Sequence, residues 1–148
     1  MARTVLGLCG LLLFRGHIML DIERMIVLDS DGLEYIYVYF YPTYKEMAFM
    51  NAVHQWPCKI GRTDQDPQKR VRQQLNSCAP ETPEIALVFQ CENSRALENV
   101  IHNYMKIHNR FIKHTFNQEW FSTNPDEVLS IVQALYNSPE DIWSRSSD

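Results

Sequence analysis

The sequence predicts a single α/β domain with a small central antiparallel or mixed β-sheet flanked by helices. The chain has 148 residues, of which 45% are hydrophobic, and this suits one domain with a buried core. Short alternating or apolar runs indicate strands, whereas runs with helical spacing follow prolines and helix-capping residues. From residue 33 onward these signals give the element order β-β-α-β-α-β-α.

The N-terminal part of the domain predicts two strands and a long connection. Residues 22–28 suit a short strand, followed by a turn signal. Residues 33–41 alternate well enough for a first core strand, which we expect to end at Pro42. Residues 43–56 then form a connection with room for one or two helical turns.

The next two elements are a strand over 58–62, opened by Pro57, and a helix over 67–76. Asp66 is a favourable N-cap and Pro67 a favourable first helical residue. If the strand at 58–62 pairs with that at 33–41 in a suitable register, Tyr37 and Lys59 share one face of the sheet.

The C-terminal part predicts a strand over 84–91, a helix to about Arg110, a short strand over 119–122 and a final helix after Asn124. The helix before Arg110 is capped by Asn93 or Ser94 and carries Glu98 and His102 one turn apart. Its expected inward stripe is Leu97, Ile101, Tyr104, His108 and Phe111.

Five short motifs carry side chains that suit phosphodiester chemistry, namely phenols, cations, carboxylates and an imidazole. Their order resembles that of the GIY-YIG endonuclease superfamily, and most closely a phage-type branch with a K-I-G second motif. Tyr35 stands where the first motif has glycine, and Lys59 where the superfamily usually has tyrosine. In chain order the motifs are Tyr35-Ile36-Tyr37, Lys59-Ile60-Gly61, Arg70, the Glu98/His102 pair and Glu119-Trp120-Phe121.

The resemblance implies a compact α/β nuclease fold and a metal-dependent endonuclease that hydrolyses DNA. Glu98 would hold Mg²⁺ or Mn²⁺, which accept one carboxylate together with phosphate oxygens and waters. Arg70 would bind the scissile phosphate. Tyr37 and Lys59 would flank the attacking water, with Tyr37 as base if cations lower its pKa, and His102 would position water or phosphate. We expect Tyr37, Lys59, Arg70 and Glu98 to line one open cleft. Asn117 and Asn124 are both candidates for a late asparagine of the family.

The charge distribution bears on DNA as the partner. The net charge of −4 is unusual for a nucleic-acid-binding protein. However, basic residues gather between 59 and 72, so a local basic surface is compatible with an acidic chain. The residues expected to bind nucleic acid are Arg62, Lys69 and Arg72.

The domain is expected over residues 22–137, between an extension or alternative-start segment at 1–21 and a tail at 138–148. The apolar run at 5–14 is too short to span a bilayer, and no cleavage site of the usual kind follows it. The cysteines match no zinc motif and read as reduced thiols. We therefore expect an intracellular protein, in the cytoplasm or nucleus, without stable membrane association, and regard export as the alternative.

Two other functions fit the same residues. A non-catalytic nucleic-acid-binding module would retain the nuclease fold, in line with the acidic net charge and the imperfect first motif. A protein-interaction domain would be favoured if Glu98 were buried in a salt bridge. The sequence does not distinguish DNA from RNA and does not specify the cleavage site.

Overall fold

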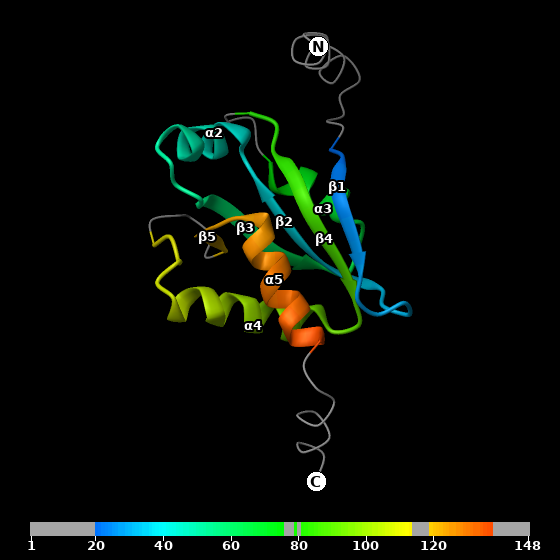
Figure 1. Ribbon diagram of the computed structural model, residues 1–148. Helices are drawn as coiled ribbons and strands as arrows, with labels where there is room; N and C mark the ends of the chain where they lie inside the picture. Colours follow the sequence, from blue (N-terminus) through cyan, green and yellow to red (C-terminus); the bar gives the residue numbers. More distant parts are fainter. Residues whose placement is uncertain (1–19, 76–78, 80, 114–118, 138–148) are drawn as a thin grey trace, which may run out of the picture.

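The structure, a computed structural model, describes residues 20–75, 79, 81–113 and 119–137 of the chain. Within this part, five strands form one mixed sheet in the order β1-β4-β2-β3-β5, and four helices pack around it (Figure 1). The strands are β1 (Ile22–Val27), β2 (Glu34–Phe40), β3 (Trp56–Thr63), β4 (Glu84–Cys91) and β5 (Trp120–Thr123). The helices are α2 (Pro42–Met50), α3 (Pro67–Gln74), α4 (Ser94–Ile107) and α5 (Pro125–Tyr136).

The sheet confirms the predicted α/β class, and its strands run in mixed directions. Strand β1 runs parallel to β4, while the β4–β2, β2–β3 and β3–β5 pairs are antiparallel. The central strand β2 is fully paired on both sides, and the residues of its C-terminal half are buried. The catalytic motifs predicted on β2 and β3 therefore lie in the best-anchored part of the sheet.

The alternation of β2 divides the core into two layers. Ile36, Val38 and Phe40 join the larger core cluster with α4 and α5, on one face of the sheet. Tyr37 and Tyr39 point to the other face and pack with Val71 of α3 in a second cluster. Figure 1 shows α3 and the α4–α5 pair on opposite sides of the sheet.

The predicted helix caps are confirmed. Asp66, Asn93 and Asn124 each accept a hydrogen bond from a backbone amide in the first turn of α3, α4 and α5, respectively. Such a cap contributes about 1 kcal/mol to helix stability. Helices α3 and α5 also have proline at the first position, as predicted.

Several boundaries differ from the prediction; β3, for example, begins at Trp56, before Pro57, and ends at Thr63. Pro42 does not merely end a strand; it is the first residue of α2, a nine-residue helix within the expected connection. Helix α4 ends at Ile107 rather than near Arg110, because Asn109 adopts a left-handed conformation with φ of 59°. The strand predicted over 22–28 is confirmed as β1, and the helical turns expected in the connection form α2.

The predicted inward stripe of α4 is wrong in its second half. Leu97, Ile101 and Met105 are buried, whereas Tyr104 is 36% exposed. The buried residues of α4 are spaced four apart along the helix. The predicted stripe stepped by three residues, from Ile101 to Tyr104, and therefore left the buried face. Phe111 lies beyond the helix and still packs against the core, where it forms an isolated bridge with Phe121.

Leu20 belongs to the predicted extension, yet it is buried in the second cluster. Its carbonyl accepts a hydrogen bond from the side-chain amide of Gln68 on α3. Residues 1–19 and 138–148 lie outside the described part, so the division into extension, domain and tail stays a prediction. Within the described residues, no helix has the length and apolarity needed to cross a membrane.

Candidate active site

The β2–β3 register brings Tyr37 and Lys59 to one face of the sheet. Tyr39 lies opposite Lys59, and Tyr37 lies opposite Gly61, so all four residues share the face that α3 covers. This confirms the predicted placement of the phenol and the ammonium group. Both residues are almost fully buried, at 1% exposure each, so the expectation that they line an open cleft is wrong.

The glycine of the K-I-G motif leaves room for the Tyr37 ring. A Cβ atom built on Gly61 would overlap the Tyr37 hydroxyl group and ring. The neighbouring atoms belong to a buried side chain that cannot easily move away. Gly61 is therefore needed for close approach, and the motif fixes the position of the phenol.

The hydroxyl group of Tyr37 is held by Gln74 at the end of α3. The Gln74 amide donates to Tyr37 Oη over 2.6 Å and accepts from Tyr39 Oη over 3.0 Å. Burial raises the pKa of Tyr37 above its usual value, although Gln74 and Arg70 lower it in part. The protein groups therefore favour the protonated phenol. The role of Tyr37 as base, which requires cations to lower its pKa, stays a prediction.

Lys59 forms an ion pair with Glu119, which directly precedes β5. The Lys59 Nζ to Glu119 Oε2 distance is 2.9 Å. Burial lowers the pKa of Lys59, whereas the hydrogen bond and charge of Glu119 raise it. Glu119 is part of the last sequence motif, but the sequence alone predicts no role for it at the site.

Helix α4 contacts the edge of β3 just beyond the last residue pair that β3 forms with β5. The β3–β5 ladder runs from the Trp56–Thr123 pair to the Lys59–Trp120 pair, and the Ile60 amide then donates to the Glu119 carbonyl. Nε2 of His102 lies 2.8 Å from the Ile60 carbonyl oxygen, so it carries the proton of this hydrogen bond. His102 also packs on Phe121, with ring centroids 4.8 Å apart.

This contact makes His102 a positioning residue for Glu98, which lies one helical turn earlier. It docks α4 on the sheet edge at the residue that follows Lys59. Burial lowers the pKa of His102, which favours the neutral ring. Its predicted part in the reaction stays a prediction.

Glu98 has the most unusual environment of the predicted site residues. Its Oε2 atom is buried and has no hydrogen-bond partner among the described residues. Burial raises the pKa of Glu98 to about 7, and the nearby charge of Glu119 adds to this effect. Arg62, Arg95 and Lys59 oppose the rise without forming an ion pair with Glu98 in the described part.

The solvent side of the site is formed by arginines. Arg70 is exposed on α3, and its charge affects the pKa values of Tyr37 and Lys59. It lies beside a hollow of about 340 Å³ at the end of β3. The hollow is lined by Arg62, Thr63, Asp64, Gln65, Arg70 and Gln73.

The residues predicted to bind nucleic acid differ in whether other residues hold their side chains. The Arg62 Nε atom donates to Ser94 Oγ over 2.8 Å, and its guanidinium lies 3.8 Å from Glu34. Lys69 is exposed on α3, and Arg72 is partly exposed on the same helix. Arg62 is thus anchored within the fold, whereas Lys69 and Arg72 can reach solvent near Arg70.

The side chains of this site are suited to an oxygen-preferring divalent ion. No group of three or more His, Cys, Asp or Glu residues within the described ranges is arranged to hold a metal. A magnesium site can consist of one or two carboxylates with waters and substrate phosphate filling the other positions. The unpartnered oxygen of Glu98, with Glu119 nearby, meets that minimum. Asn124 is not available as a further ligand, because its side-chain oxygen caps α5 and its side-chain NH₂ group donates to the His54 carbonyl. Asn117, the other candidate for the family's late asparagine, lies outside the described residues.

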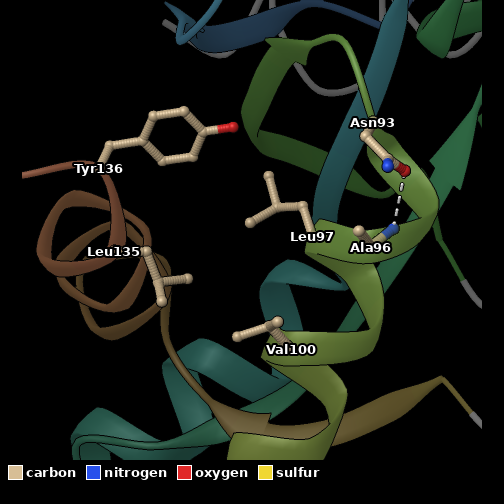
Figure 2. Close-up of a pocket in the computed structure, with 6 residues that line it drawn as sticks. All are labelled: Asn93, Ala96, Leu97, Val100, Leu135 and Tyr136. Carbon is tan, nitrogen blue, oxygen red and sulfur yellow. Dashed lines mark hydrogen bonds between the residues drawn. The ribbon is translucent and has the colours of Figure 1, made fainter. Parts of the chain in front are cut away.

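A second hollow, of about 420 Å³, lies between α4 and α5 and has a different character (Figure 2). The only hydrogen bond drawn there is the Asn93 cap on the Ala96 amide, and the facing side chains are mainly aliphatic. It contains neither a carboxylate nor a cation, so it does not suit phosphodiester chemistry. Its lining residues are Asn93, Ala96, Leu97, Val100, Leu135 and Tyr136.

Comparison with known proteins identifies one domain family. Residues 34–135, from the start of β2 to the end of α5, match the T5orf172 domain. No curated protein and no solved structure matches the chain. The matched region covers more than half of the 148 residues and contains every candidate site residue. The chain therefore belongs to the T5orf172 domain family, a phage-associated family of nuclease-like domains.

Proposed function

We propose that this protein is a metal-dependent endonuclease of the GIY-YIG type that hydrolyses phosphodiester bonds in DNA. The observation that carries the proposal is the buried, unpartnered Oε2 atom of Glu98. A buried carboxylate that served only the fold would be expected to have a donor or a cationic partner. Glu98 instead lies beside a second carboxylate, and a bound cation would relieve this arrangement.

Each residue of the cluster then has a role that its surroundings support. Arg70, exposed at the rim, binds a non-bridging oxygen of the scissile phosphate and stabilises the charge that develops there. Tyr37 donates its hydroxyl proton in a hydrogen bond to the attacking water or the phosphate, since burial keeps the phenol protonated. The ion pair with Glu119 favours the charged form of Lys59, which lies on the buried side of the reacting groups. Mg²⁺ or Mn²⁺ at Glu98 would supply Lewis-acid stabilisation of the phosphate.

The experiment is a plasmid-nicking assay with Mg²⁺, Mn²⁺ or a chelator. We expect nicking with either ion and none with the chelator. Glu98→Gln should abolish nicking because it removes the anionic ligand, whereas Glu46→Gln changes an exposed glutamate of α2 and should have no effect. Wild-type protein that never nicks DNA under any of these conditions contradicts the proposal.

A non-catalytic nucleic-acid-binding module is the second candidate, and the burial of Tyr37 and Lys59 favours it. In that case the wild-type protein would bind DNA without cutting it, and Glu98→Gln would leave binding unchanged. The interaction-domain alternative has less support, because Glu98 has no salt bridge among the described residues.

A further inference from the structure

An exposed group of aromatic rings borders the candidate site and has no part in the proposed reaction. Tyr41 and Trp120 are partly exposed, and Tyr44 is 43% exposed. They surround a hollow of about 270 Å³, together with Pro57 and Ile112. We call these five residues the aromatic shelf.

The rings of the shelf have fixed orientations. Tyr41 and Trp120 are nearly parallel, with an interplanar angle of 13° and centroids 5.9 Å apart. The buried Tyr39 ring meets both of them edge-on. Tyr44 also contacts Tyr41 edge-on, with ring centroids 6.5 Å apart. The shelf is thus held from beneath by the core, while part of its aromatic surface remains available to a ligand.

The shelf continues the face of the sheet that holds the candidate site. Trp120 is the strand partner of Lys59, and the preceding Glu119 forms the ion pair with Lys59. Tyr41 follows Tyr37 by four residues of extended chain, a separation of about 13 Å along the strand direction. That corresponds to roughly four base steps of a stacked strand, and to fewer when the strand is stretched.

We propose that the aromatic shelf stacks an unpaired nucleobase of the strand whose phosphate is bound at Arg70 and Glu98. This inference rests on the proposed function and adds that the substrate is single-stranded or locally unpaired at the site. Aromatic side chains bind bases of any sequence in this way, because every base has a π-face. Paired bases within a duplex keep both faces stacked on their neighbours and do not offer them to the shelf.

Size and charge favour a base over other occupants. The hollow is smaller than the roughly 300–1,000 Å³ of pockets for drug-sized ligands, so it suits a single planar ring system. Burial raises the pKa of Tyr41, and Tyr44 and the negative charge of Glu81 add to this effect. The Glu81 carboxylate, which accepts a hydrogen bond from the Thr43 amide beside Tyr41, disfavours a phosphate at that ring. The exposed cations Arg70, on α3, and Lys113, which follows Ile112 of the shelf, are available to phosphates instead.

The test measures fluorescence anisotropy of labelled oligonucleotides with Ca²⁺, another oxygen-preferring cation, in place of Mg²⁺, so that the cation charge is present while cutting is slowed. One oligonucleotide is single-stranded and the other is the same sequence as a duplex. Tyr41→Leu and Trp120→Leu replace a ring by an apolar side chain. Each should weaken single-strand binding by about 5- to 100-fold, the range for one lost base–aromatic stack. Duplex binding should change less than about two-fold by the same argument.

Two controls separate stacking from folding. Tyr41→Phe keeps the ring and should retain wild-type binding, and Tyr104→Leu removes a partly exposed ring from α4, away from the shelf. All variants are first compared by thermal unfolding. If Trp120→Leu fails to fold, Tyr41→Leu and Tyr41→Phe still decide the question.

Unchanged single-strand binding in Tyr41→Leu, or an equal loss on duplex and single strand, overturns the stacking inference. If the wild-type protein nicks DNA in that case, the proposed function stands alone. If the wild-type protein neither binds an oligonucleotide nor nicks a plasmid, both proposals fail.

Discussion

Replacing Glu98 by glutamine should make the protein more stable above neutral pH than the wild type. Burial and the neighbouring Glu119 raise the pKa of Glu98 from 4.5 to about 7. Between these values the folded protein retains a proton that the unfolded chain has lost. Wild-type stability therefore falls as pH rises through this window, and the full cost is present above pH 7.

The size of the effect follows from the two pKa values. Their separation corresponds to about 3 kcal/mol at 1.36 kcal/mol per pKa unit. Glu98 is only half-buried, and solvent screening reduces this to about 1–2 kcal/mol. Glutamine has nearly the same shape and no charge, so its own packing adds an offset that does not depend on pH.

Urea unfolding of both proteins at pH 5 and pH 8 measures the difference. We expect the stability of Glu98→Gln relative to the wild type to increase by about 1–2 kcal/mol from pH 5 to pH 8. Glu46→Gln, on the exposed face of α2, should show no such increase. A constant difference across this range would refute the argument that Glu98 is held in an unfavourable ionised state. Repeating the pH 8 measurement with Mg²⁺ at ten times its Kd should stabilise the wild type by about 1.4 kcal/mol and leave Glu98→Gln unchanged.

Three further substitutions, with Lys69→Ala as a control for one of them, test the geometry of the site. Gly61→Ala should lower stability by about 1–3 kcal/mol and displace the Tyr37 ring, since the added methyl overlaps it; unfolding and near-ultraviolet circular dichroism report both effects. Arg70→Ala should slow nicking by about 10²–10³-fold, because one preorganised donor to the transition state is lost. Its control, Lys69→Ala, should weaken DNA binding with little change in the single-turnover rate of nicking. Tyr37→Phe keeps the ring and removes only the hydroxyl group, which accepts a hydrogen bond from Gln74, so single-turnover nicking should fall while stability changes by no more than about 1–2 kcal/mol. Full activity in Tyr37→Phe would exclude the hydroxyl from the reaction.

Local signals predicted most of the fold. Capping residues and prolines marked the starts of α3, α4 and α5, because these signals act within one helical turn. The apolar run over 84–91 gave β4 with its observed boundaries. The spacing of Glu98 and His102 correctly placed both on one side of α4, where the ring binds Ile60 and the carboxylate is affected by the charge of Lys59. Alternation on β2 and β3 likewise placed Tyr37 and Lys59 on one face.

The remaining features depend on contacts between distant segments. Glu119 meets Lys59 across 60 positions of the chain, and Gln74 meets Tyr37 across 37, so no local pattern reveals either pair. The pKa of Tyr37 depends on such contacts too. The charge of Arg70 lowers it, but desolvation by the packed sheet and α3 is the larger effect and raises it. Burial at this site is a property of the assembled layers, not of any single motif.

The electrostatics of the site make cation and phosphate binding interdependent. Without a cation, a phosphate near Glu98 meets two carboxylates, and Lys59 is already neutralised by Glu119. Arg70 is then the principal positive charge available to it, at an exposed position where solvent screens the attraction. A divalent cation at Glu98 reverses this balance, because it favours the ionised carboxylate and supplies charge on the buried side. A raised pKa, an unpartnered oxygen and an ion-paired lysine therefore have one physical explanation, which is a site whose charges are completed only when the cation binds.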